Sequence, residues 1–200
     1  MASNGGNPIV VISPKFCAPC PVDFTIAKKF LLFTQGNYDV LKVPGNNIFK
    51  VRGTPLTWPR RSVLVDAAGV PLVSLQKKLW SCHKRWQVYR GDSSDSINLL
   101  FSVKKSSVFQ LMTSLHVFLA SNTAEKVCDF KIKGNSWDEF AVYQGNSNNI
   151  IAKMQKMHAF RSIFLGDDTY SNTVCSNVDY VFMAALCVVL NEINTRDDDD

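Results

Sequence analysis

The sequence lacks the segments that send a chain out of the cell or across a membrane. No basic stretch followed by an apolar run opens the chain, and no Asn-x-Ser/Thr sequon occurs, so we expect an intracellular protein. The longest apolar run spans eleven residues, 180–190, whereas a membrane helix needs about eighteen. We therefore expect no transmembrane span and a cytoplasmic, peripheral-membrane or nuclear location.

Motifs for catalysis or for cofactors are also missing. No Ser-centred nucleophile elbow, Gly-rich phosphate loop or zinc-binding helix motif occurs, and His83, His116 and His158 lie in no catalytic pattern. Cys17 and Cys20 have the spacing of a metal-binding pair, but no second pair exists. We expect a protein that is not an enzyme and that holds no cofactor or metal. The six cysteines are interpreted as reduced thiols.

Positive charge is what the chain has in excess. The formal net charge is +5, yet residues 197–200 are all aspartate, so the other 196 residues carry +9. A basic body favours anionic partners, which here means phospholipid headgroups or nucleic acid.

Short alternating apolar runs, separated by turns rich in Gly, Asn and Asp, predict antiparallel strands. Four hairpins are predicted, at residues 38–43 with 48–51, 63–65 with 72–75, 86–89 with 99–103, and 140–143 with 150–154. Further strands are predicted at residues 108–119, 127–133, 159–165 and 169–174, with an edge strand at 9–12, while 22–33 stays open between strand and helix. Antiparallel sheets of about twelve strands usually curl or close.

The run at residues 180–190 predicts a helix that is apolar on every face. Asn177 and Asp179 precede it as N-cap and first-turn acid. Such a helix must be buried on all sides, and the lumen of a barrel offers that place. The predicted fold is mostly β: an antiparallel barrel of about twelve strands enclosing a buried C-terminal helix at about 177–194. We expect a flexible start (1–8), one barrel domain (9–195) and an acidic tail (196–200).

A series of motifs running in order along the chain resembles the plant LURP-one-related family, part of a tubby C-terminal-like fold group that includes the phospholipid scramblases. The residues that carry the resemblance are Asp66, Gly69 and Pro71; Ser81, His83 and Arg85 through Gly91; Val103 through Ser107; Cys128 through Phe130; Phe164 through Asp168; and Asn177 through Tyr180. The resemblance implies the same barrel around a central helix.

For function, the resemblance implies a membrane-tethered or phosphoinositide-binding role with a link to plant defence. Scramblases carry acylated cysteines ahead of their barrel, so the resemblance offers lipidation of Cys17 or Cys20 as the alternative to free thiols. Asp167 and Asp168 lie where scramblases bind calcium, but Gly166 replaces the first acid, so we interpret them as an exposed turn.

Six basic residues at predicted strand ends are the candidate lipid-binding set: Lys77, Lys78, Lys84, Arg85, Lys104 and Lys105. Further basic pairs are Arg60 with Arg61 and Lys131 with Lys133, and an ordinary solvated surface is the alternative for all of them. The sequence does not favour nucleic acid as a partner, because only Trp58 adds an aromatic ring to a basic pair. We expect a non-catalytic interaction module for anionic phospholipid headgroups or phosphoinositides. The alternative is a protein-binding scaffold or transcription-linked factor without lipid affinity.

Overall fold

The protein forms a closed ring of antiparallel strands around its last helix. The structure, a computed structural model, describes residues 7–28, 38–42, 46–53, 61–78, 85–106, 114–134, 138–157 and 169–197. Within these residues the strands are β1 (Val22–Lys28), β2 (Tyr38–Lys42), β3 (Asn46–Gly53), β4 (Arg61–Asp66), β5 (Pro71–Lys77), β6 (Trp86–Arg90), β7 (Leu99–Lys105), β8 (Ser114–Leu119), β9 (Phe130–Gly134), β10 (Glu139–Gln144), β11 (Ile150–Lys156) and β12 (Thr169–Val174). Their order is sequential around a closed barrel.

Strand β1 closes the ring by pairing with both β12 and β2. Thr25, for example, lies opposite Ser171 on one side and Leu41 on the other. The segment 22–33, open between strand and helix in the sequence, is therefore a strand in its described part. Register shifts occur in the hairpins β2–β3, β4–β5, β6–β7 and β10–β11. Such irregularities bend and twist a strand, which favours closure of the sheet.

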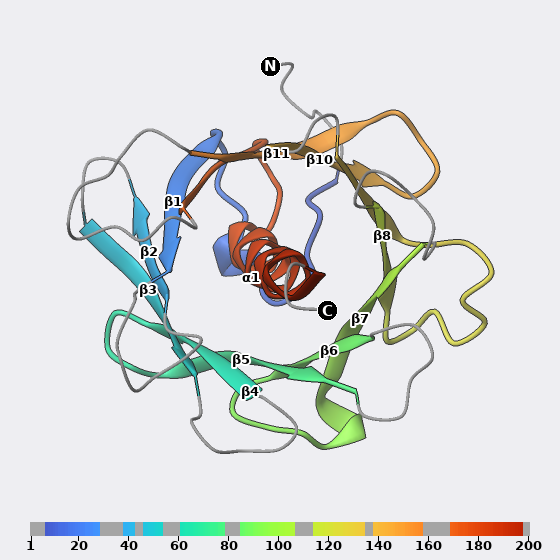
Figure 1. Cartoon of the computed structure of the whole chain (residues 1–200), viewed down its shortest axis with the longest axis horizontal. Helices are drawn as coiled ribbons and strands as arrows, with labels where there is room; N and C mark the ends of the chain where they lie inside the picture. Colours follow the sequence, from blue (N-terminus) through green and yellow to red (C-terminus); the bar gives the residue numbers. More distant parts are fainter. Residues whose placement is uncertain are drawn as a thin grey trace.

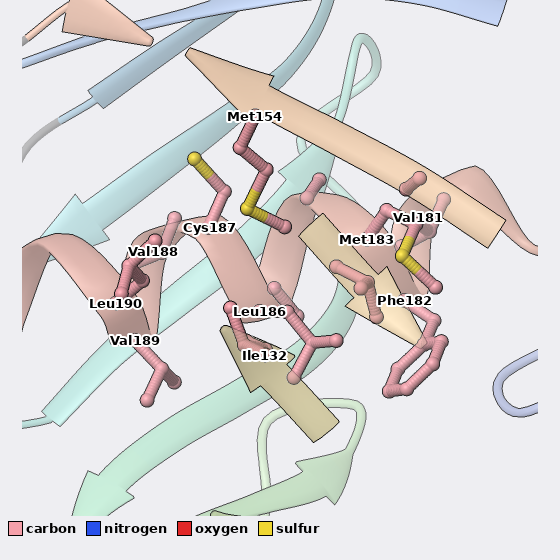
Figure 2. Packing of buried hydrophobic residues seen from close by; sticks show 14 of the residues in the cluster. Ile132, Met154, Val181, Phe182, Met183, Leu186, Cys187, Val188, Val189 and Leu190 are labelled. Atoms are coloured by element: carbon pink, nitrogen blue, oxygen red, sulfur yellow. The ribbon is translucent and has the colours of Figure 1, made fainter. Parts of the chain in front are cut away.

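Helix α1 (Tyr180–Asp197) fills the lumen, as Figure 1 shows. Every residue from Val181 to Leu190 is at most 1% exposed. The ring of Phe182 contacts Phe101 of β7 and Phe130 of β9, each at a centroid distance of 5.0 Å. Ile132 and Met154 from the wall lie among the helix side chains (Figure 2). The predicted fold class, a barrel around a buried C-terminal helix, is confirmed.

The capping residue of α1 is Asp179, not Asn177. One carboxylate oxygen of Asp179 accepts from the backbone N–H groups of Val181 and Phe182, at 3.1 and 3.0 Å. Asn177 lies before the cap with a positive φ of 60°. The prediction of Asn177 as the N-cap and Asp179 as the first-turn acid is wrong, because both residue types can cap a helix and the helix begins at Tyr180, directly after Asp179.

The prediction of an edge strand at residues 9–12 is wrong. Ile9 forms only an isolated bridge with Val178, and the chain then turns through the short helix η1 (Pro14–Phe16) beside α1 (Figure 1). A closed ring offers no free edge for a further strand, so the apolar side chains are buried instead at the end of the barrel where α1 begins. Ile12 and Phe16 are 5% and 7% exposed.

The remaining strand predictions can be compared with the structure only within the described residues. Strand β8 corresponds to the second half of 108–119, β9 to most of 127–133, and β12 to 169–174. The predicted strand at 159–165 lies outside the described residues, as do Asp167 and Asp168.

Candidate anion-binding site

The basic pair on β7 is divided between the two faces of the barrel wall. Val103 is fully buried against the lumen, so its neighbour Lys104 points outward. Lys105 takes the inward register at the end of the strand, where it pairs with the buried Leu115 of β8. Only Lys104 of this pair therefore belongs to the outer wall.

The pair at the end of β5 is divided in the same way. Leu75 is fully buried, and Lys77 shares its inward register opposite the buried Trp86 of β6. Lys78 is exposed, has the outward register and donates its backbone N–H to the carbonyl of Arg85 at 2.8 Å. Lys78 and Arg85 are thus neighbours on the outer wall.

These outward residues continue across neighbouring strands as one line. Trp86 pairs with Val103, which sets Arg85 beside Lys104; Lys104 then pairs with His116, and His116 with Lys131. We call this line the basic row; its members are Lys78, Arg85, Lys104, His116 and Lys131. Its four steps span about 19 Å, at roughly 4.8 Å per strand.

One carboxylate reaches the basic row. Glu125, in the connection between β8 and β9, accepts hydrogen bonds from both terminal nitrogens of Arg85, at 2.8 and 2.6 Å, and from Lys104 Nζ at 3.1 Å. Figure 1 shows this connection (yellow) outside the ring of strands. The Arg85 hydrogen bonds, more than any other influence, hold the pKa of Glu125 below its usual value. In the described part of the chain no other acidic side chain is ion-paired with the row.

Aromatic rings border the row. Lys104 Nζ lies 4.5 Å from the centroid of Phe118, while Lys131 Nζ lies 5.5 Å from that of Tyr143, the residue paired with Lys131 on β10. The exposed Lys133, two residues along β9, reaches the same Tyr143 ring at 5.9 Å. Cation–π contacts of this kind hold an ammonium group without neutralising it.

Lys131 is largely buried, and no described residue supplies a counter-charge to it. It is only 9% exposed and makes no ion pair to any described residue. A lysine can bury its aliphatic stem and keep its ammonium group at the surface. Lys131 therefore adds to the row a positive charge that no described carboxylate neutralises.

His116 lies between two cations of the row. Burial, followed by the charges of Lys104, Lys131 and Lys133, holds the pKa of His116 below its usual value. The imidazole is therefore neutral near pH 7, and an anion that offset the charges of those lysines would raise the pKa of His116.

The other predicted site residues are placed as follows. Lys84 lies outside the described residues, as do Cys82, His83, Arg60 and Trp58. In the sequence Lys131, Lys133 and His116 were noted without any link to the candidate set, and Glu125 and Tyr143 were missed. The missing signal is the pairing of strands, because the row joins residues that are far apart in the chain.

Among the described residues, cysteines and other metal-ligand side chains form no centre near the row. Cys17 and Cys20 are free thiols, and Cys17 Sγ lies 3.5 Å from the carbonyl oxygen of Ile9, to which it donates. Burial raises the pKa of Cys17, and it raises that of Cys187 in α1 to about 12, so both thiols stay protonated. Across the described segments no cluster of three His, Cys, Asp or Glu residues is arranged to hold a metal ion. No helix in those segments has the length and apolar character needed to cross a bilayer.

The chain was compared with known proteins. The family model described as LURP-one-related matches residues 22–191. Protein LURP-one-related 15 of Arabidopsis thaliana is 47% identical over 190 residues, covering 94% of this chain and 87% of the relative. Protein LURP1 of the same plant is 42% identical over 189 residues, covering 94% and 91%. An X-ray structure of an Arabidopsis thaliana protein aligns with a TM-score of 0.72 at 39% identity, covering 92% of this chain and 98% of that one. The chain belongs to the LURP-one-related family.

Proposed function

We propose that the chain is a non-catalytic interaction module that docks on anionic phospholipid surfaces, phosphoinositides included, through the basic row. The observation that carries the proposal is the row itself: five neighbouring strand positions hold four permanent cations, and among the described residues one carboxylate, Glu125, pairs with two of them, Arg85 and Lys104. Arginine and lysine donors, lined by rings, are the chemistry that recognises phosphate oxygens. The plant-defence setting is part of this proposal and rests on the family resemblance.

The expected affinity is low. Each lysine or arginine near an anionic leaflet contributes about 1 kcal/mol, so the four permanent cations of the row contribute about 4 kcal/mol. That energy corresponds to a dissociation constant of roughly a millimolar for one molecule. Because the charges lie at the surface, the attraction must weaken as ionic strength rises.

Each of the two lysine pairs has one outward and one inward member, so two double variants that lose the same charge can be compared. The first variant combines Lys78→Ala with Lys104→Ala and removes two outward cations; the second combines Lys77→Ala with Lys105→Ala and removes two of inward register. We expect the first to weaken binding roughly thirtyfold and the second to change it less than about threefold. The measurement is co-sedimentation with phosphatidylcholine vesicles that carry a phosphatidylinositol phosphate, over a range of salt concentrations.

Two outcomes contradict the proposal. Wild-type protein that shows no salt-sensitive binding to these vesicles removes lipid docking altogether. Equal losses in the two double variants show that net charge, and not the basic row, governs binding. A protein partner whose capture survives charge reversal at Lys78 and Lys104 supports the scaffold alternative.

A further inference from the structure

The connection that carries Glu125 is built to present its carboxylate. Asn122 Oδ1 accepts the backbone N–H of Glu125 at 3.2 Å, and Asn122 Nδ2 donates to the carbonyl of Val127 at 2.8 Å. Glu125 also has a positive φ of 47°, which a residue with a Cβ adopts only when its surroundings impose it. A conformation of this kind often marks a functional position.

The ends of the connection are fastened to the wall. Asp129 Oδ2 accepts the backbone N–H of Leu119, the last residue of β8, at 2.9 Å, and it also accepts from Asn122 Nδ2 at 2.8 Å. These bonds hold the loop as one unit over the outer face. Glu125 is thereby directed at Arg85 and Lys104 and does not extend into solvent; its side chain is 24% exposed.

The carboxylate occupies the donors that a phosphate would need. Arg85 offers a planar fork of two N–H groups, and a fork of this shape binds a carboxylate or a phosphate in the same two-point manner. Lys104 supplies a third donor to the same oxygen pair. We call the contact of Glu125 with Arg85 and Lys104 the Glu125 clasp.

We propose that the Glu125 clasp is an internal competitor of the basic row, which a phosphomonoester displaces and a phosphodiester does not. The inference rests on the proposed function. A ligand that needs Arg85 and Lys104 binds only when the clasp is open. A clasp that is closed about ten times as often as it is open lowers the apparent affinity of every such ligand roughly tenfold.

The charge of the ligand decides whether it can displace the Glu125 carboxylate from Arg85 and Lys104. A phosphodiester carries one negative charge, as Glu125 does, so the exchange brings it no electrostatic gain. A phosphomonoester carries about −1.5 to −2 near pH 7 and has three acceptor oxygens. The clasp therefore favours headgroups with a terminal phosphate, such as phosphorylated inositol, over simple phosphodiester lipids.

The decisive variant is Glu125→Gln, which keeps the shape of the side chain and removes its charge. The matched control is Asp23→Asn, which removes the same charge from an exposed position on β1. Vesicles of phosphatidylcholine carry either phosphatidylglycerol or a phosphatidylinositol phosphate at matched surface charge. We expect wild type to bind the second kind at least roughly tenfold more tightly than the first, Glu125→Gln to gain roughly tenfold on both kinds, and Asp23→Asn to gain less than about twofold.

Hydrogen exchange provides a second readout that does not depend on a variant. Soluble inositol hexakisphosphate should speed exchange of the Glu125 amide in the wild-type protein, because displacement of the clasp frees the loop; a ligand that only covers the surface slows exchange. If Glu125→Gln binds no better than Asp23→Asn and the amide does not accelerate, the clasp is not a competitor, although lipid docking stands. If neither wild type nor Glu125→Gln binds in a salt-sensitive way, the proposed function itself is wrong.

Discussion

The inner and outer faces of the barrel wall differ in what contacts them. The chain's own helix packs against the inner face, whereas the described residues offer the charges of the outer face few acidic partners. On the inner face the wall side chains from β7 and β9 meet α1, and the helix is buried along ten successive residues. On the outer face, the described residues supply one carboxylate partner to the four permanent cations of the basic row. The inner face is complete and serves stability, whereas the outer face is incomplete and is where a partner should be sought.

The largest effect on stability is expected when a charge is placed on the inner side of the wall. Ala184→Asp puts a lone carboxylate in a position that is 0% exposed, which costs several kcal/mol and should unfold the domain. Ile97→Asp is the control, because Ile97 is 85% exposed, and it should change stability by less than about 0.5 kcal/mol. Urea unfolding followed by circular dichroism distinguishes the two variants. A well-folded Ala184→Asp protein would mean that the helix does not fill the lumen.

Asp179 is the exception on the inner side, a fully buried carboxylate that is satisfied by the backbone. Besides its two bonds to the helix, its second oxygen accepts from Val11, Ile12 and Ser13 at 3.3, 2.7 and 3.1 Å. Asp179→Asn places an N–H₂ group against backbone donors and should destabilise the fold by about 2–4 kcal/mol.

Asp66 supplies the matched control for that substitution. Its carboxylate also accepts two backbone N–H groups, from Ala68 and Val70, but in an exposed turn. Asp66→Asn should therefore cost less than about 1 kcal/mol. If Asp179→Asn and Asp66→Asn lower the urea midpoint of unfolding equally, burial of the Asp179 carboxylate does not increase its contribution to stability.

The smallest expected effect is on the outer face, at His116. Because the pKa of His116 is lower in the folded protein, the unfolded chain binds more protons as the pH falls below about 6.5, and the fold loses stability there. A bound anion acts in the opposite direction, since it raises the pKa of His116 and binding then takes up a proton. The phosphomonoester of the vesicle also takes up a proton near pH 6, so both proteins experience that loss of ligand charge. The ratio of wild-type affinity to His116→Gln affinity should rise roughly two- to fivefold between pH 7 and pH 5.5. A ratio that does not change with pH would show that His116 does not act on the anion site.

The fold followed from local sequence patterns, whereas the site did not. Alternation within each strand and the apolar run at 180–190 are properties of adjacent residues, so they predicted the barrel and its filled lumen. The basic row depends on register, and the shift between Val88 and Tyr89 in the β6–β7 hairpin shows that register varies along a single hairpin. Pairs of neighbours such as Lys104 and Lys105 looked equivalent in the sequence, yet strand geometry turns them to opposite faces. Nothing local marked Glu125, which reaches the row through a loop.

The seam between β1 and β12 has a consequence for how the protein is made. It pairs Val22 with Val174, so the ring is completed only by a strand that the ribosome delivers after the other eleven. Helix α1, which fills the lumen, is synthesised later still. Until then, the growing chain exposes inward-facing apolar side chains and two unpaired strand edges to solvent or to a chaperone, and the domain cannot finish folding before the helix has emerged.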